Sequence, residues 1–167
     1  MRVLFVCLGN ICRSPTAEGV LRALAARGPE HDGVQIDSAG TGAYHVGEPP
    51  DPRSAAAAAR RGIDLNGSAR QVRVEDFERF DLIVAMDRSN RDELLRLAPD
   101  RDAESKVRLL REYHPESVAL GELDVPDPYN GGPTGFDDVL DIVTAACHSL
   151  LREIDDARGA DAGIMRP

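Results

Sequence analysis

The sequence predicts a single α/β domain, built on a central, twisted, four-stranded parallel sheet with helices on both faces. Four short segments, residues 3–6, 34–38, 82–86 and 107–110, have the apolar or alternating patterns of strands. Segments with helical spacing separate them, which is typical of parallel strands joined by crossover helices. The chain of 167 residues has the size of one domain and leaves little room for a second.

The first strand is expected to lead directly into a helix. Ser14 is the expected N-cap, because Pro15 then occupies the first helical position, where a backbone N–H is not needed. Apolar residues recur at helical spacing as far as Gly28, which is expected to end this helix. The second strand is followed by a loop that runs to Pro50.

Three later segments have helical patterns. Residues 52–61 include five consecutive alanines, a second helix is expected to begin near Ser89, and residues 136–154 place their apolar side chains on one face. Beyond that last helix the sequence becomes polar and rich in small residues. We therefore expect the folded domain to span residues 1–157, with a flexible tail at 158–167.

Composition disfavours several classes of function. With 29 acidic and 20 basic residues the chain carries a net charge of -9, which opposes broad contact with nucleic acid or anionic lipid. No apolar run approaches the roughly 20 residues that cross a membrane, and the first residues lack a signal-peptide pattern. The three cysteines are an odd number in a chain too large to need disulfides, so a reducing, cytoplasmic location is expected.

The segment from Cys7 to Pro15 carries the strongest indication of chemistry. It joins the first strand to the first helix, where the backbone N–H groups of a tight loop and of the helix's first turn form an anion site. Gly9 and Asn10 tolerate the left-handed conformations that such a loop requires. Cys7 would lie at the base of this positive cradle, which favours a thiolate, and the planar fork of Arg13 can bind two oxygens of a phosphoryl group.

The alternative for Cys7 is a small apolar residue at the end of a buried strand. A cysteine and an arginine six positions apart are weak support by themselves, because all basic residues except Lys106 are arginines. The strand before, the helix after and the absence of a Walker lysine pattern favour a phosphate-binding cysteine loop. The four histidines are scattered without ligand spacing, so no metal is expected.

The run VCLGNICRSPTAE, which begins at Val6, resembles the start of the low-molecular-weight protein tyrosine phosphatases. The likeness continues through residues 37–41, 45–47, 69–71, 86–90 and 127–129 and covers the chain to about Ile154. The resemblance implies an enzyme without cofactor or metal that hydrolyses phosphotyrosine in proteins or peptides through a phosphocysteine intermediate. A monomer that binds neither nucleic acid nor membrane is expected.

The resemblance also implies the roles of individual residues. Cys7 would attack phosphorus, and Asp127 would donate a proton to the departing phenolate; the residues alone do not select Asp127 over Asp124 or Asp87. Ser14 would hydrogen-bond the Cys7 sulfur, while Asn10 and Ser38 would hold the shape of the loop. The phosphate-binding loop itself would comprise Leu8, Gly9, Asn10, Ile11, Cys12 and Arg13.

The same resemblance places Leu8, Ile11, Tyr44, Tyr129 and Asn130 on the walls of a substrate pocket. Ile11 favours phosphotyrosine, since similar phosphoarginine phosphatases have threonine there. Asn130 and Tyr44 depart from the family pattern, which often has other aromatic residues at these positions. Such a pocket would admit a long aromatic ester and leave a short serine phosphate out of reach.

Three further residues need separate treatment: one glycine and two cysteines. Gly67 stands where a histidine often completes the hydrogen-bond network behind the loop. Cys12 resembles the family's second cysteine and is a candidate redox partner of Cys7, against a passive apolar role. Cys147 continues the apolar stripe of the last helix and is expected to be a core residue.

Three alternative functions stay open. A phosphoarginine phosphatase and an arsenate reductase share the expected fold, although the reductase needs two further cysteines and none lies between Cys12 and Cys147. A non-catalytic phosphate-binding module is the alternative from another class. The presence of Cys7, Arg13 and Asp127 together argues against it.

Overall fold

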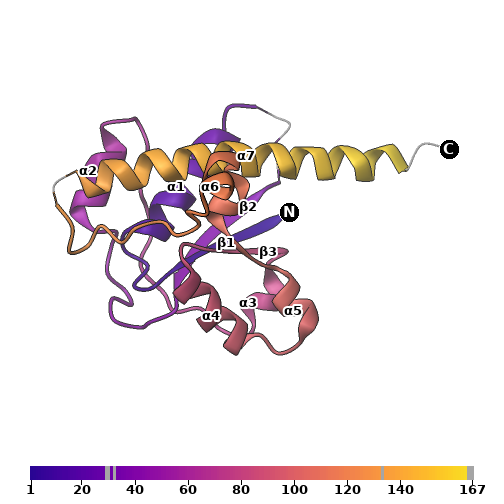
Figure 1. Ribbon diagram of the computed structural model, residues 1–167, viewed down its shortest axis with the longest axis horizontal. Helices are drawn as coiled ribbons and strands as arrows, with labels where there is room; N and C mark the ends of the chain where they lie inside the picture. The colour runs from indigo at the N-terminus through magenta and orange to yellow at the C-terminus, as the bar shows by residue number, and fades with distance from the viewer. Residues whose placement is uncertain (29–30, 32, 133, 165–167) are drawn as a thin grey trace.

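The computed structural model describes residues 1–28, 31, 33–132 and 134–164 (Figure 1). Its sheet has four strands, all parallel, in the order β2-β1-β3-β4. The strands are β1 (Arg2–Cys7), β2 (Gln35–Gly40), β3 (Leu82–Ala85) and β4 (Val107–Leu109). The fold class predicted from the sequence is confirmed. Because β1 lies between β2 and β3, the residues that follow its carboxyl end have a neighbouring strand on each side.

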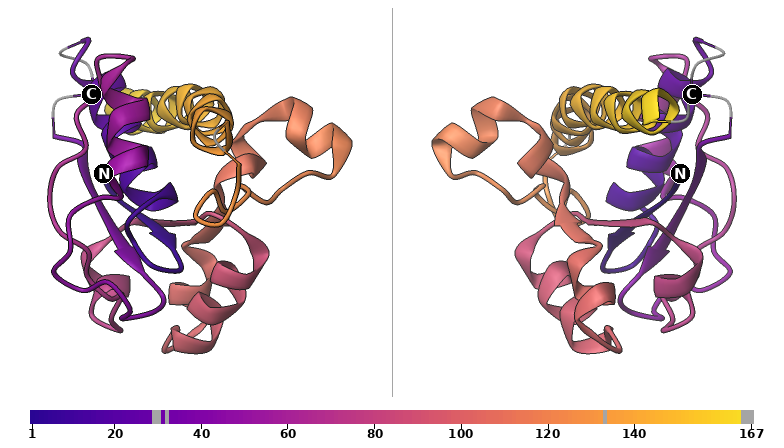
Figure 2. Two further views of the ribbon diagram at one scale, coloured as in Figure 1. Left: turned by 90° about the vertical axis from the view of Figure 1, so that its left-hand side faces the viewer. Right: turned by 90° about the vertical axis from the view of Figure 1, so that its right-hand side faces the viewer.

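Helices cover both faces of the sheet (Figure 1). On one face lie α1 (Arg13–Ala25) and α7 (Gly135–Ile164), which pack against each other. On the other lie α3 (Asp76–Arg79), α4 (Arg88–Leu97) and α5 (Arg101–Ser105). The structure also contains α2 (Pro52–Ala59), the 3-10 helix η2 (Leu110–Tyr113) and α6 (Pro115–Leu120). Figure 2 shows the segment with α6, in orange, standing out from the side of the molecule.

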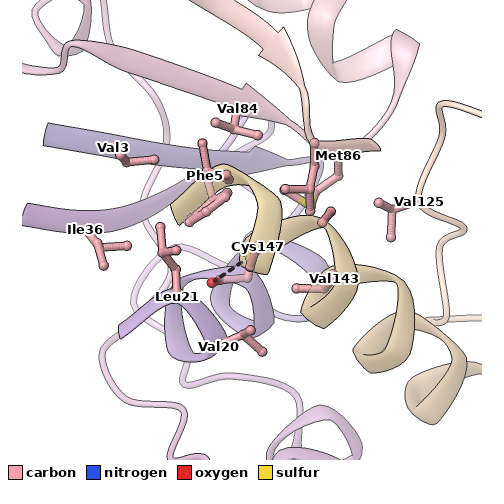
Figure 3. Close-up of a cluster of buried hydrophobic side chains, with 14 of the residues drawn as sticks. Val3, Phe5, Val20, Leu21, Ile36, Val84, Met86, Val125, Val143 and Cys147 are labelled. Carbon is pink, nitrogen blue, oxygen red and sulfur yellow. Dashed lines mark hydrogen bonds between the residues drawn. The ribbon is translucent and has the colours of Figure 1, made fainter. Parts of the chain in front are cut away.

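The side chains of β1 alternate between two hydrophobic cores, one on each face of the sheet. Val3 and Phe5 face α1 and α7 in the first core, which Figure 3 shows together with Cys147 of α7. Leu4 and Val6 belong to the second core, beneath α3, α4 and α5. Burial on both faces explains why the sequence of β1 is continuously apolar rather than alternating. It also makes the strand a rigid support for the residues that follow it.

Two helix starts differ from those predicted. Helix α1 begins at Arg13 with Cys12 as N-cap and no side-chain cap, because the Ser14 hydroxyl is buried and bonded to the Cys7 sulfur instead. Helix α4 begins one residue before Ser89 and is capped by Asp87. The boundary of α1 thus depends on a contact with β1, whereas that of α4 follows from a local cap in which Asp87 accepts from the Asn90 N–H. The short helices α3, α5 and α6 were not predicted, since four to six residues are too few for a periodic pattern.

The last helix is longer than the sequence predicted. Helix α7 continues through residue 158 as far as Ile164, so residues 158–164 are helical where a flexible tail was expected. Its apolar face is buried up to Ile154, and the alanine-rich sequence that follows can extend a helix already formed. The rest of the expected tail, 165–167, lies outside the described residues. Neither α7 nor any other described helix is long and apolar enough to cross a membrane.

Candidate active site

The loop between β1 and α1 rests closely on the chain that follows β2. The backbone N–H groups of Thr41 and Gly42 donate to the carbonyl oxygens of Cys7 and Leu8, at 2.8 and 2.9 Å. A Cβ atom on Gly40 would lie 2.7 Å from the Leu8 carbonyl oxygen, too close for any side chain. Glycine at this position therefore allows the loop to pack closely against the end of β2. The sequence analysis did not identify this need for glycine.

Asn10 determines the shape of the loop. Its φ of 56° is the one positive value among the described residues other than glycine, and asparagine tolerates it better than most residues. The side-chain amide donates to the hydroxyl oxygens of Ser14 and Ser38, both at 2.9 Å, and its oxygen accepts from the Arg70 N–H at 2.9 Å. The loop is thus bound to α1, to β2 and to the segment before α3.

The Cys7 sulfur is the focus of these contacts. It accepts from the Asn10 N–H at 3.2 Å and lies 3.1 Å from the Ser14 hydroxyl oxygen. Because Ser14 already accepts from Asn10, its own proton is available for the sulfur, with the Ala39 carbonyl at 3.3 Å as the other acceptor. Hydrogen-bond donors directed at the sulfur stabilise negative charge on it. The structure therefore presents Cys7 in an environment suited to a nucleophile.

Behind the loop, Glu18 completes this network. Its carboxylate accepts from the Ser38 hydroxyl at 2.5 Å and pairs with Arg22 at 2.6 Å. Burial raises the pKa of Glu18, and the bonds from Ser38 and Arg22 partly oppose that shift. The carboxylate borders a cavity of about 210 Å³ that Gly67 also lines. Gly67 is the position at which the family resemblance often implies a histidine. The sequence analysis missed Glu18 because an acid in the first turns of a helix needs no tertiary partner to explain it.

Arg13 faces the same centre as Cys7 from the first turn of α1. Its side chain is almost fully buried and donates to Asp87 at 2.5 Å, to the Val125 carbonyl at 3.1 Å and to Asp127 at 2.8 Å. Among the described residues, Nε–H and the second N–H of Nη2 have no hydrogen-bond partner. These two groups point the same way in the planar guanidinium. They form a fork that can bind two oxygens of one phosphoryl group.

Asp87 is a site residue that the sequence analysis named only as an alternative acid. One carboxylate oxygen accepts from Arg13, and the other caps α4 by accepting from the Asn90 N–H at 2.7 Å. Its position directly after a strand and before a helix was the available signal. In the structure it orients Arg13 rather than facing the pocket entrance.

The pocket above Cys7 has a volume of about 190 Å³ and an open mouth. Asp127 lies at this mouth with its side chain 46% exposed, which is the position a proton donor to a leaving group requires. The lining comprises the predicted residues Cys7, Leu8, Gly9, Ile11, Cys12, Arg13, Tyr44, Asp127, Tyr129 and Asn130, with His45 in addition. Asn10, Ser14 and Ser38 lie behind the loop, so the structure brings all the predicted site residues together.

His45, which the sequence analysis assigned no role in the site, also lines the pocket. Its ring lies 6.0 Å from the ring of Tyr129, and Nδ1 is 2.8 Å from a Glu48 carboxylate oxygen. A Cβ atom on Gly9 would come within 3.0 Å of this ring, so glycine in the loop leaves space for it.

The three cysteines are free thiols in different surroundings. Cys12 also lines the pocket, but burial raises its pKa to about 12, against an opposing hydrogen bond from Ser54. Cys147 is fully buried between α1 and α7 (Figure 3), where burial raises its pKa strongly. In the described part of the chain, no group of three or more His, Cys, Asp or Glu side chains is placed to hold a metal ion.

Comparisons with known proteins identify the family of this chain. The model of the family described as low molecular weight phosphotyrosine protein phosphatase matches residues 2–159. A low molecular weight protein-tyrosine-phosphatase of Streptomyces coelicolor is 52% identical over 92% of this chain and 93% of the relative. A crystal structure of an Entamoeba histolytica protein tyrosine phosphatase, with Hepes in its active site, has a TM-score of 0.88 and 37% identity, covering 95% of this chain and 99% of that one. A Drosophila arginine phosphatase has a TM-score of 0.84 and 32% identity, covering 92% and 98%. This chain belongs to the low molecular weight phosphotyrosine protein phosphatase family.

Proposed function

We propose that this protein is a protein-tyrosine phosphatase that hydrolyses phosphotyrosine, and small aryl phosphates, through a phosphocysteine intermediate. The observation that carries the proposal is the convergence on one pocket of a hydrogen-bonded Cys7 sulfur at its base, the free fork of Arg13 and the Asp127 carboxyl at its mouth. These are the nucleophile, the oxyanion clamp and the proton donor that phosphate monoester hydrolysis requires.

In the first step the phosphoryl group binds to the loop N–H groups from Leu8 to Arg13 and to the guanidinium fork. The Cys7 thiolate forms a bond to phosphorus while the bond from phosphorus to the phenolic oxygen breaks. Asp127 gives its proton to that oxygen, so a neutral phenol leaves. The loop donors and Arg13 stabilise charge on the equatorial oxygens throughout, which is the main catalytic contribution in phosphoryl transfer.

Asp127 has to change partners to act in this step. In the structure one of its oxygens accepts from Arg13 and the other accepts from the Tyr129 N–H at 3.1 Å. A protonated carboxyl must instead direct one oxygen to the leaving group. The exposed position of Asp127 at the pocket mouth permits that turn when a substrate arrives.

In the second step water hydrolyses the phosphocysteine. Asp127, now a carboxylate, accepts a proton from the water as its oxygen bonds to phosphorus, and the bond between sulfur and phosphorus breaks. The Ser14 hydroxyl donates to the departing thiolate and makes it a better leaving group. Inorganic phosphate then leaves, and Asp127 holds the proton needed for the next cycle.

The roles of these groups predict the pH dependence of the activity. The first step needs an ionised Cys7 together with a protonated Asp127, so the maximum should lie on the acid side of neutral. A rate that still increases above about pH 8 would contradict this assignment.

The pocket walls support phosphotyrosine as the substrate. Leu8, Tyr44 and Tyr129 are exposed apolar surfaces around the mouth, where they can pack against an aromatic ring. Ile11 lines the pocket and offers no hydroxyl to a guanidinium group, which disfavours phosphoarginine. Asn130 at the edge leaves one wall more open than a second aromatic residue would.

We also propose a redox role for Cys12. Both Cys7 and Cys12 line the pocket as free thiols, so an oxidised Cys7 would meet a neighbouring thiol. Attack of that thiol on a Cys7 sulfenic acid would form a disulfide and release water. Inactivation by peroxide should then be reversed by thiols in the wild type but not in Cys12→Ser.

The setting of the enzyme follows from the same features. The proposed enzyme is a monomer that acts on phosphotyrosine proteins, since the mechanism needs no residue beyond those of this site. Free thiols at the site support a cytoplasmic location, because an oxidising compartment would consume the nucleophile. The domain of residues 1–157 contains every residue of the site.

Hydrolysis of an aryl phosphate by the wild type, Cys7→Ser and Asp127→Ala tests the proposal, with phosphoarginine and arsenate as competitors. Cys7→Ser should lose at least about 10⁴-fold in kcat/KM, and Asp127→Ala should lose about 10²- to 10⁴-fold with a poor leaving group. Full activity in Cys7→Ser would refute the mechanism. Faster turnover of phosphoarginine, or reduction of arsenate, would move the protein to one of the alternative functions.

A further inference from the structure

Arg53, in the first turn of α2, connects the phosphate-binding loop to the segment that carries Asp127. Its guanidinium binds the buried Asp51 carboxylate with Nε and Nη2, at 3.0 and 2.8 Å. The Asp51 N–H donates to the Ile11 carbonyl in the phosphate-binding loop at 2.7 Å. On its other side, Arg53 donates to the Tyr129 carbonyl at 3.2 Å. One side chain thus bridges both parts of the site.

The orientation of Arg53 is fixed by more than these bonds. The guanidinium carbon lies 4.7 Å from the centre of the Phe136 ring and 5.5 Å from that of Tyr129. Stacking on aromatic rings suits the planar guanidinium. The ion pair with Arg53 also lowers the pKa of Asp51 from its ordinary value, so that carboxylate stays charged. Although its side chain is half-exposed, Arg53 is therefore held in one place.

Few other hydrogen bonds hold the segment of residues 126–130, in which Pro128 is buried and the Tyr129 ring lies 6.0 Å from that of His45. In the described part of the chain, Arg13 and Arg53 are the side chains from outside this segment that hydrogen-bond to it. The proposed reaction requires Asp127 to turn from Arg13 toward the leaving group. At that moment, among the described side chains outside the segment, Arg53 is the one that still hydrogen-bonds to it, at the Tyr129 carbonyl two residues from the acid.

We propose that Arg53 is a positioning residue for the proton transfer, holding the turn from Asp127 to Tyr129 over the pocket while Arg13 binds the phosphoryl group. This inference rests on the proposed function and adds to it a residue outside the cysteine loop. Arg53 does not contact the reacting atoms and acts through Asp127. A small displacement of a proton donor is enough to slow the reaction severely.

The dependence on the leaving group separates this role from a general structural one. A phenolate needs a proton to leave, whereas a dinitrophenolate leaves without one. Arg53→Gln should therefore lower kcat/KM for phenyl phosphate about tenfold or more, and for dinitrophenyl phosphate by less than about threefold. Asp127→Asn has already lost the proton donor. When Arg53→Gln is added to Asp127→Asn, the ratio of kcat/KM for phenyl phosphate to kcat/KM for dinitrophenyl phosphate should therefore stay the same.

Two other variants keep the test decisive. Arg60→Gln removes an exposed arginine at the end of the same helix, which pairs with Asp137 at 2.9 Å, and should leave both substrates at wild-type rates. Arg53→Lys keeps a positive charge beside Asp51 but cannot reach Asp51 and the Tyr129 carbonyl with one planar fork. It should fold like the wild type, by thermal melting, and still show the selective loss.

An equal loss for both substrates in Arg53→Gln and Arg53→Lys would overturn the proposal, as would wild-type rates in either variant. These results would leave the proposed function intact. The proposed function fails in a different way, if the wild type hydrolyses neither substrate or Cys7→Ser retains activity.

Discussion

The two sides of the phosphate-binding loop are built differently. Behind it, Asn10, Ser14, Ser38 and Glu18 are all buried and joined by direct hydrogen bonds. In front of it, the Asp127 side chain is 46% exposed and makes a bond to Arg13 that the reaction must break. The back is thus organised before substrate arrives, and the front is organised by the substrate. Because the back of the loop is already ordered, holding Cys7 in place adds no free-energy cost during the reaction. Asp127, in front, stays able to exchange hydrogen-bond partners.

Breaking the back of the loop should have the largest effect. Asn10→Ala removes the partner of Ser14, of Ser38 and of the Arg70 N–H and places alanine at a positive φ. We expect a loss of about 3 kcal/mol in the free energy of unfolding, measured in urea. The activity should fall at least about 100-fold, because the Cys7 sulfur loses its fixed surroundings.

Asn66→Ala is the control for this variant, since Asn66 is exposed and borders the cavity behind the loop. It should match the wild type in stability and rate. If Asn10→Ala behaved like Asn66→Ala, the back of the loop would not be the rigid part of the site.

The contacts that orient Arg13 should affect the rate rather than the stability. Asp87→Asn keeps an N-cap for α4 but removes the negative charge that orients Arg13. We expect kcat/KM to fall about tenfold, with the melting temperature nearly unchanged. Asp100→Asn, which alters the N-cap of α5 far from Arg13, should change neither quantity. A large loss of stability in Asp87→Asn alone would mean that this carboxylate belongs to the rigid part.

The buried carboxyl group of Glu18 should make the stability of the network behind the loop depend on pH. Because burial raises the pKa of Glu18, the folded protein holds this proton at pH values where the unfolded chain has lost it. Stability contributed at this position therefore falls as pH rises through that interval. The glutamine of Glu18→Gln does not titrate. The melting temperature of this variant minus that of the wild type should therefore increase by a few degrees between acid and neutral pH.

The control for the pH series is Glu104→Gln, at an exposed position on α5. A difference between Glu18→Gln and the wild type that stays constant across pH, or that falls as pH rises, would contradict a raised pKa of Glu18.

The smallest expected effect concerns the surface around the front. A net charge of -9 should disfavour acidic residues beside the phosphotyrosine, since attraction for the phosphate is confined to the loop and Arg13. At low ionic strength, basic phosphopeptides should have a kcat/KM several times higher than acidic ones, and added salt should reduce the difference. Faster turnover of acidic peptides at low salt would show that local charges at the mouth outweigh the net charge.

Residues within one continuous segment were predictable from the sequence. Cys7, Asn10 and Arg13 lie between a strand and a helix, where local rules of backbone conformation and anion binding apply. Ser14 was assigned both to the site and to a helix cap; in the structure its hydroxyl lies beside the Cys7 sulfur, and α1 has no side-chain cap. Asp127 required the family resemblance, because many aspartates precede a proline in a turn.

The residues that the sequence analysis missed, or named only for another role, act across the fold. Asp87, Glu18 and Arg53 each have an adequate local explanation, as a cap or a charged residue on a helix. Their roles depend on partners distant in the sequence, such as Tyr129 for Arg53. His45 is similar, because the space for it is created by Gly9 in another segment. Patterns in a single sequence do not show which distant residues come into contact in the fold.

The most direct test of the central claim is to trap the intermediate. Asp127→Ala should form phosphocysteine from dinitrophenyl phosphate without needing an acid and hydrolyse it slowly for lack of a base. After rapid quenching, mass spectrometry should find one phosphoryl group on the protein and assign it to Cys7. The same experiment with Cys7→Ser in that background should find none. A phosphoryl group on another residue, or rapid turnover with no covalent intermediate, would contradict the mechanism.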